Sequence, residues 1–283
     1  MSDLCIRAVG AVSPLGEDTA ATVGAIYTES QPFDAPPMTP IPAAVKGIDR
    51  LVALGGFALR EATGALAKGT PCGLMVCAPP EEEGGVGPSS SLLSQLAAEA
   101  ELVLVPEASG GFRSRRGSIV EALHSAHEAL QATRLTALCV LGVDSPVTMG
   151  KAAANGPVVA EAAAAILLSR SSDPDSLAFL SGIGAAEPPP GDQPNLDKGI
   201  RSAVDKAMAR VQSPGLPIGA LVHDFPQARA GFEGLAWLKG SLSLPTTPDL
   251  LTLAPNFSVG ETGAASEVLC LVTLAFLMGK GVT

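Results

Sequence analysis

Histidines next to carboxylates are the residues of this chain whose types and spacing could support acid–base or metal chemistry. His124 and His127 lie three residues apart in a segment expected to be helical, so their imidazoles would be side by side. His223 and Asp224 end an expected strand, and strand ends of α/β sheets face the crevice where ligands bind. Packing or solvation of the helical pair is the preferred interpretation. A catalytic role for His223 stays the alternative, because the sequence places no nucleophile beside it.

Cysteine and serine side chains are the available nucleophiles. The cysteines are scattered, four of the five lie within apolar stretches, and none has zinc-ligand spacing; they are Cys5, Cys72, Cys77, Cys139 and Cys270. We therefore expect buried, reduced thiols, no metal site and no cofactor. Ser118 follows an Arg-Gly pair and could act as a nucleophile only if another residue, such as His223, served as its base.

The only dense basic cluster of this acidic chain consists of Arg113, Arg115 and Arg116. The three residues precede an expected helix, and positive charge at a helix N-terminus is unfavourable unless an anion binds there. A solvated or partner-facing turn is the preferred interpretation of the cluster. An anionic ligand or an acidic partner is the alternative.

Composition excludes several classes of protein. The 283 residues carry a net charge of −10, with 47% hydrophobic and 16% charged residues. The apolar content is sufficient for a folded core, unlike that of a disordered chain, and the acidic balance argues against nucleic-acid binding. The first residues resemble no secretory signal, and no apolar stretch reaches the roughly 18 residues of a spanning helix. We expect a cytoplasmic protein without membrane insertion.

The elements that must position these residues alternate between strands and helices. Apolar runs predict strands at residues 5–12, 72–78, 102–106, 137–143, 158–169, 177–185, 219–224 and 250–254. Helical spacing and capping residues predict helices at residues 18–28, 48–68, 91–99, 118–133, 197–211, 231–241 and 261–280. The alternation indicates an α/β fold with a largely parallel sheet covered on both faces. A seam near residues 170–175 divides the chain into residues 1–172 and 173–283, two halves of one compact unit.

Several segments resemble β-ketoacyl synthases, in the order in which that family has them. Residues 6–16, IRAVGAVSPLG, are similar to the family's opening strand and turn, and residues 49–66 resemble its first long helix. Residues 158–170 resemble a strand that carries a motif glutamate, here Glu161, and residues 260–265, GETGAA, are similar to the start of the last active-site helix. The resemblance implies a thiolase-like αβαβα fold built from two related βαβαβαββ halves.

The residues of the family's Cys-His-His site are replaced in this chain. The resemblance places the nucleophilic cysteine at Arg116, the first histidine near His223 and the second at Glu261. An arginine stays protonated and cannot act as a nucleophile, and the sequence has no cysteine between Cys77 and Cys139. The sequence therefore predicts that the family's catalytic site is absent and that no cysteine lies near its position.

A second departure concerns the end of the chain. The resemblance implies that each half ends with a pair of strands, which the first half has at residues 137–143 and 158–169 and the second half lacks. We expect residues 177–185 to form an open sheet edge, which is a template for pairing with another chain. Leu177, Phe179 and Leu180 are the candidate partner-binding residues of this edge.

These observations favour a catalytically inactive ketosynthase-like protein that acts as an accessory, adaptor or structural binding partner. The expected partner is another protein, such as a bacterial secretion-system effector, a synthase or a carrier protein, and the family resemblance also suggests a homodimer. The alternative is an acyltransferase or condensing enzyme of fatty-acid or polyketide type with a non-standard site, in which Ser118 is the nucleophile and His223 the base.

Overall fold

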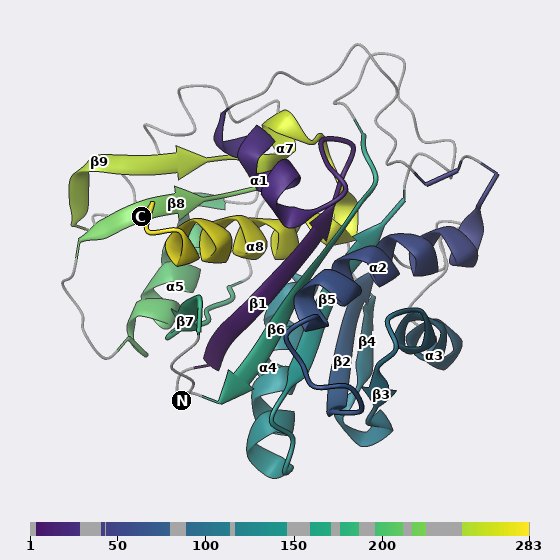
Figure 1. Cartoon of the computed structure of the whole chain (residues 1–283). Coiled ribbons are helices and arrows are strands. Elements are labelled where there is room, and N and C mark those ends of the chain that lie inside the picture. Colours follow the sequence, from purple (N-terminus) through teal and green to yellow (C-terminus); the bar gives the residue numbers. More distant parts are fainter. Residues whose placement is uncertain are drawn as a thin grey trace.

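The computed structural model describes residues 4–28, 41–42, 44–79, 89–113, 117–145, 159–170, 176–186, 196–211, 217–224 and 245–282 (Figure 1). We call the elements from β1 to β6 the first half of the molecule and those from β7 to α8 the second half. The division at residues 172 and 173 stays a prediction.

The first sheet has seven strands in the order β3-β2-β5-β6-β1-β7, with β4 also paired to β2. Its strands are β1 (Leu4–Val12), β2 (Pro71–Ala78), β3 (Val103–Leu104), β4 (Gly110–Arg113), β5 (Leu138–Asp144), β6 (Ala162–Arg170) and β7 (Ala178–Leu180). Strand β2 runs parallel to β3, β4 and β5, whereas β6 is antiparallel to both β5 and β1. The sheet is therefore mixed, and the predicted β5–β6 strand pair is present.

Helices cover both faces of this sheet. One face carries α2 (Gly47–Thr63) and α3 (Ser90–Glu99), and the other carries α4 (Ser118–Ala132) and α8 (Ser266–Gly279). Alternate residues of β5 point to opposite faces, so Leu138 and Val140 join the core under α4 and α8 while Cys139 and Leu141 join the core under α2 and α3. Burial on both faces explains why these strands are continuously apolar.

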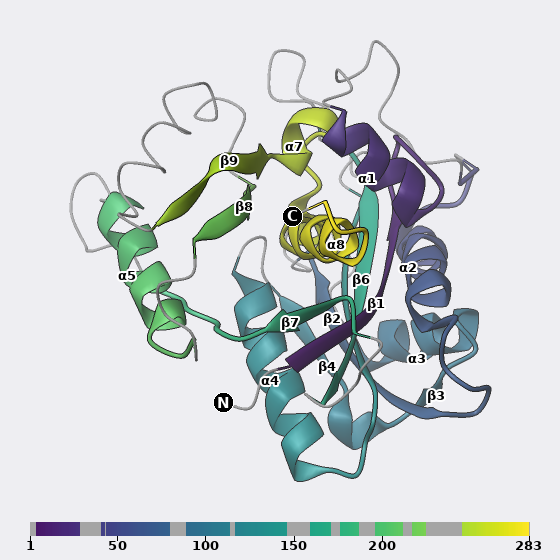
Figure 2. The same ribbon diagram turned by 60° about the vertical axis from the view of Figure 1, so that its left-hand side comes forward.

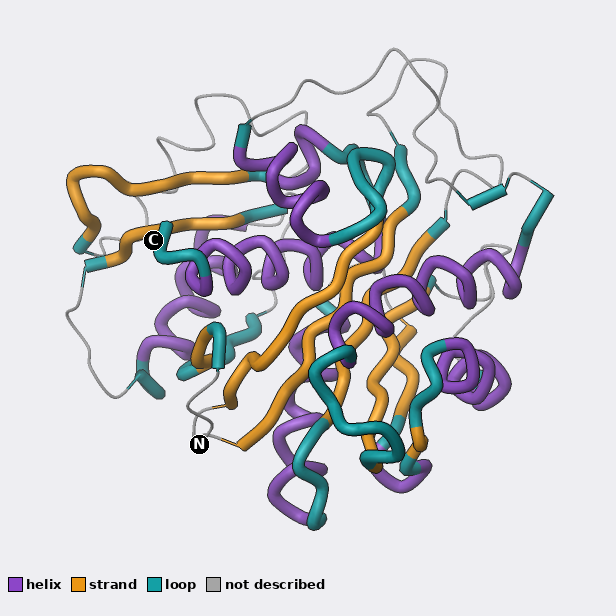
Figure 3. The backbone as a smooth tube through the Cα atoms, in the orientation of Figure 1, coloured by secondary structure: helices purple, strands orange, loops and turns teal. Residues whose placement is uncertain are grey.

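The second half adds a smaller parallel pair, β8 (Ile218–Val222) and β9 (Thr246–Leu253), preceded by α5 (Leu196–Met208). Figure 2 shows α8 between the first sheet and this pair, with α5 on the far side of β8. The order of layers is therefore helix, sheet, helix, sheet, helix. Figure 3 shows the long strands of the first sheet side by side through the middle of the molecule and β8–β9 as a separate pair.

Short elements complete the connections. Helix α1 (Thr19–Tyr27) starts as predicted at Asp18, whose Oδ1 accepts the Ala21 N–H at 2.7 Å. The 3-10 helix η5 (Gly263–Ala265) lies within the helix predicted at residues 261–280. The 3-10 helix η2 (Pro106–Ala108) starts at the last residue of the strand predicted at 102–106, and the short helix α7 (Pro255–Ser258) lies between two predicted elements.

Several predicted boundaries are wrong. The helix predicted at residues 48–68 ends at Thr63, and the last helix begins at Ser266 rather than at residue 261. The strand predicted at residues 177–185 is reduced to β7, and that at 102–106 to β3. Strand β4 was not predicted, because its sequence GGFR has no apolar run. The predicted helix at residues 231–241 lies outside the described residues.

Candidate functional site

The N-terminus of α4 is the position at which the family resemblance places the nucleophile. Gly117 precedes the helix with a φ of 84°, a left-handed conformation that glycine adopts without steric cost. Arg115 and Arg116 lie outside the described residues, and Arg113 ends β4 with an exposed side chain.

A carboxylate from α8 caps this helix N-terminus. The backbone N–H of Gly117 donates to Glu267 Oε1, and that of Ile119 donates to Glu267 Oε2 at 3.4 Å. A negative charge at this end of a helix is favourable, since the unpaired N–H groups carry partial positive charge. Glu267 thus supplies a negative charge at the start of α4 from within the chain. An anionic ligand of the arginine cluster stays a prediction.

A buried cysteine lies beside the same helix end, which corrects the prediction that none is nearby. The side chain of Cys77, near the end of β2, lies close to Ser118, the first residue of α4. Burial raises the pKa of the Cys77 thiol to about 12, and the charges of Glu267 and Glu121 act in the same direction. The thiol is therefore protonated at neutral pH, the opposite of an activated nucleophile.

The carboxyl end of β8 approaches the same region. His223 and Asp224 follow β8, and both are half-buried. Burial lowers the pKa of His223, which favours its neutral form. Burial, together with the negative charges of Asp224 and Glu267, raises the pKa of Cys270 well above its usual value. Helix α8 therefore contacts the start of α4 through Glu267 and also packs against β8. That the three positions form one site stays a prediction of the resemblance.

Glu261, which the resemblance places at the second histidine, is joined through its backbone to the residues before β6. Its backbone bridges Val159, and its carbonyl accepts the Ala160 N–H at 3.0 Å. Three residues after Glu261, Ala264 donates its N–H to Asp144 Oδ2 at 2.9 Å. These contacts fix the backbone of residues 261–264, and the side chain of Glu261 is half-buried.

The motif glutamate is part of a buried ion pair. Glu161 accepts from Arg50 Nε at 2.6 Å and from Nη2 at 2.5 Å, and Ser145 donates to it at 2.9 Å. Arg50 also donates to the carbonyl oxygens of Pro42 and Val45. Both charged side chains have no exposed surface. The pair joins α2 to the residues before β6.

The helical histidines show no paired arrangement. His124 Nδ1 lies 2.8 Å from the Val120 carbonyl oxygen, and its Nε2 lies 3.4 Å from Arg210 Nη1. His127 is half-buried on the same helix. Among the residues that the structure describes, no group of three or more His, Cys, Asp or Glu side chains is arranged to hold a metal ion.

The candidate partner-binding residues lie on β7 or, for Leu177, directly before it, at the outer end of the first sheet. Strand β7 pairs antiparallel with β1, with Cys5 opposite Phe179. Phe179 is 55% exposed, and Leu177 and Leu180 are half-buried. The structure therefore places a large apolar side chain in solvent at this edge.

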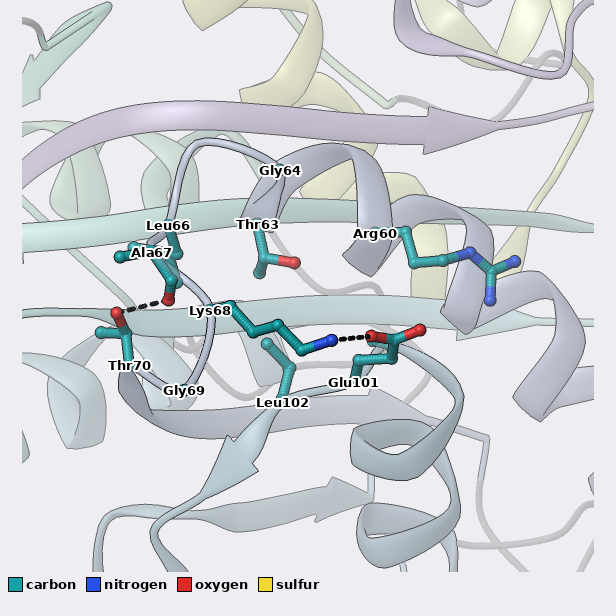
Figure 4. Close-up of a pocket in the computed structure, with 11 residues that line it drawn as sticks. Arg60, Thr63, Gly64, Leu66, Ala67, Lys68, Gly69, Thr70, Glu101 and Leu102 are labelled. Carbon is teal, nitrogen blue, oxygen red and sulfur yellow. Dashed lines mark hydrogen bonds and ion pairs between the residues drawn. The ribbon is translucent and has the colours of Figure 1, made fainter.

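A surface pocket of about 260 Å³ lies at the opposite end of the sheet (Figure 4). The end of α2, the following loop and residues 100–102 line it, and Lys68 Nζ lies 3.7 Å from Glu101 Oε2 at its mouth. This is the amino end of β2, whereas ligands of α/β sheets bind at carboxyl ends. None of the sequence-predicted site residues lines it.

In the described part of the chain, no helix is long and apolar enough to cross a membrane.

Comparison with known proteins gives the fold. No protein-family model matches the chain, and no curated protein matches its sequence. An oxazolomycin ketosynthase domain from Streptomyces albus JA3453 matches in structure with a TM-score of 0.67 and 17% identity, over 99% of this chain and 80% of that one. The ishigamide ketosynthase/chain length factor matches with a TM-score of 0.68 and 17% identity, over 99% and 92%. A β-ketoacyl synthase from Burkholderia phymatum STM815 matches with a TM-score of 0.67 and 15% identity, over 99% and 87%. The chain therefore has the thiolase-like α/β fold of ketosynthases.

Proposed function

We propose that this chain is a catalytically inactive protein on a ketosynthase fold, which acts as an accessory or adaptor that binds another protein. The observation that carries the proposal is the carboxylate of Glu267 at the N-terminus of α4, where it accepts the N–H groups of Gly117 and Ile119. A thiolate or an oxyanion formed at this helix end would meet a fixed negative charge.

The neighbouring side chains support the same proposal. The Cys77 thiol is buried and has a pKa of about 12, so it is not a thiolate at neutral pH. The position of the family's second histidine holds Glu261, and that of its nucleophile holds Arg116. Catalysis requires a nucleophile beside a base and a donor for the oxyanion, and these residue types do not supply that set.

A binding role is supported by the surface of the second half. Phe179 on β7 is 55% exposed, with the half-buried Leu177 and Leu180 on either side. Exposed apolar side chains at a strand edge favour pairing with another chain. The net charge of −10 favours partners that are neutral or basic at the contact. An effector, a synthase and a carrier protein stay the proposed kinds of partner.

The test of inactivity is incubation of the purified chain with acetyl- and malonyl-thioesters of phosphopantetheine. We expect no acyl adduct by intact-mass spectrometry and no release of carbon dioxide above a protein-free control. An adduct that is lost in Ser118→Ala and in His223→Gln would instead establish the acyltransferase alternative, in which the acyl group passes from the thioester to the Ser118 hydroxyl and the thiol is released. An adduct lost in Cys77→Ser would overturn the proposal through a different nucleophile.

The role of Glu267 has its own test. In Glu267→Gln the negative charge that raises the Cys77 pKa is removed, so alkylation of Cys77 by iodoacetamide at pH 9 should become faster. Glu99→Gln is the matched control, because Glu99 is exposed on α3 and pairs with Arg60 at 2.6 Å. Equal alkylation rates in wild type and Glu267→Gln would mean that the carboxylate does not suppress thiol chemistry at this site.

A further inference from the structure

Two buried cysteines of the first sheet face each other across neighbouring strands. Cys72 is the second residue of β2, and Cys139 is the second residue of β5, which runs parallel to β2. Their Sγ atoms lie 3.8 Å apart, and neither residue has exposed surface. Both belong to the core under α2 and α3. The first half therefore contains a pair of thiols in contact, which neither the fold comparison nor the proposed function uses.

The two thiols differ in acidity. The hydrogen bond between them lowers the pKa of Cys72, because it stabilises the Cys72 thiolate. The same hydrogen bond, together with burial, raises the pKa of Cys139 well above its usual value. Since the thiolate is the nucleophilic form of a cysteine, Cys72 is suited to attack first, and the protonated Cys139 is suited to react second.

The surface pocket at the amino end of β2 shares side chains with the core around this pair. Leu66, Ala100 and Leu102 line the pocket, and all three also belong to, or pack against, the core that contains both cysteines. Thr70, which lines the pocket as well, precedes Cys72 by two residues (Figure 4). An uncharged oxidant about as small as water can therefore approach the pair from the pocket.

The start of β2 is the part of the sheet that must move if the two sulfurs form a bond. A disulfide is about 2.05 Å long, so the sulfurs must come closer by about 1.8 Å. The strand register offsets the two cysteines by two residues, so the approach runs along the strands. The bond from the Gly73 N–H to the Ala137 carbonyl oxygen at this end is long, at 3.4 Å, and hence weak. We expect bond formation to shift this end of β2 together with the adjoining residues 64–70.

We infer that Cys72 and Cys139 form a site of reversible oxidation by hydrogen peroxide. The Cys72 thiolate attacks one peroxide oxygen, the O–O bond breaks, and the leaving hydroxide takes up a proton to become water. The Cys139 sulfur then attacks the sulfenic acid on Cys72; the S–O bond breaks, the S–S bond forms and a second water leaves. Two thiols are thus oxidised to a disulfide while the peroxide is reduced to two waters. The disulfide is uncharged, as an apolar core requires.

Peptide mass spectrometry of the full chain after treatment with hydrogen peroxide tests the site. Free thiols are blocked with N-ethylmaleimide during unfolding, and we expect a cross-linked peptide pair containing Cys72 and Cys139 that dithiothreitol separates. Cys139→Ser should abolish the cross-link and leave a sulfenic acid on Cys72 that dimedone traps. Cys5→Ala is the matched control and should leave the cross-link unchanged, because β5 and β6 separate β2 from the buried Cys5 of β1. Oxidation of Met278, which is 41% exposed, shows that the peroxide was active.

Hydrogen exchange measures the movement that the disulfide requires. We expect the amides of residues 64–73 to exchange faster in the oxidised protein, by about tenfold, and to return to the original rate after reduction. Oxidised Met278 without a cross-link, or cross-linking of Cys72 to Cys5 or Cys77 in equal yield, would overturn the inference. A sulfenic acid in Cys139→Ser that forms on Cys139-independent thiols alone, and not on Cys72, would overturn it as well. The site is independent of the proposed binding function, so the thioester assay does not bear on it.

Discussion

The first and second halves differ in how completely their strands and helices are buried. Residues 72–78 of β2 and all seven residues of β5 are buried, whereas every residue of β8 is half-buried. Helix α2 buries Leu54 and Leu59 completely, while Ile200 and Val204 of α5 stay half-buried. The comparison teaches that the described strands and helices of the second half are enclosed less completely than those of the first half.

The largest effect should come from breaking the buried ion pair of the first half. Glu161→Ala leaves the Arg50 charge buried without its carboxylate, so the free energy of unfolding should fall by about 3–5 kcal/mol. Urea denaturation followed by circular dichroism measures the change. Glu99→Ala is the control, because its pair with Arg60 is exposed, and it should cost less than about 1 kcal/mol. Similar losses of unfolding free energy in both variants would mean that the unpaired, buried Arg50 charge costs no more than the exposed Arg60 charge.

Alanine at two glycines, one in each half, compares the halves directly. Gly10→Ala and Gly184→Ala would each place a Cβ 1.9 Å from a helix carbonyl oxygen. Gly10→Ala should cost about 1–3 kcal/mol, because α2 is held on its buried face and cannot shift. Gly184→Ala should cost less, because the half-buried α5 can move away from the strand. Thermal unfolding of both variants measures the difference, and a larger loss for Gly184→Ala would contradict the comparison.

Alkaline titration should affect the first half. The Cys77 pKa is raised from 9.0 to about 12 by burial, so above pH 9 the unfolded state loses a proton that the folded state keeps. Stability is then fully present below pH 9 and falls as the pH rises toward 12. Between pH 8 and pH 10 the wild type should lose about 1.4 kcal/mol more than Cys77→Ser. Parallel pH profiles for the two proteins would mean that the thiol titrates normally in the folded state.

Acid titration should affect the second half, by the smallest amount. Burial lowers the pKa of His223 below its usual 6.5, so the unfolded state takes up a proton before the folded state does. Stability is therefore unaffected above pH 6.5 and falls as the pH drops below it. His223→Gln should flatten the profile between pH 7 and pH 5, by less than the Cys77 effect because the imidazole is only half-buried. If the stability of His223→Gln fell more steeply with falling pH than that of wild type, this would contradict the lowered pKa of His223.

The sequence predicted the helices and strands that are determined by local patterns of residues. The strands β1, β2 and β5 were located to within a residue because each is a mostly apolar run, and α1 because Asp18 caps it. Strand β4 was missed because its hydrogen bonds come from β2, a tertiary cause. The strand predicted at residues 177–185 is shorter because only its first part has a described neighbour. The mixed direction of the sheet likewise depends on pairing rather than on the apolar pattern.

The candidate site was less predictable than the fold. Placing His223, Glu261 and the start of α4 required the family resemblance, since no local pattern joins residues so far apart in the chain. The Glu267 cap joins residues 150 positions apart, and no periodicity reveals such a contact. The closeness of Cys77 and Ser118 follows from β2 ending beside the start of α4. A carboxylate in the first turn of an otherwise apolar helix was the available signal for Glu267.

The pairing of β7 with β1 has a consequence for the order in which the chain folds. Strand β1 lies between β6 and β7, which are both made much later in synthesis. The apolar β1 must therefore stay unpaired on the ribosome until β6 emerges, a state that exposes an aggregation-prone edge. Strand β7 then docks on β1 and starts the second half from a finished sheet. Strand β1 is therefore synthesised before both of its neighbours in the sheet.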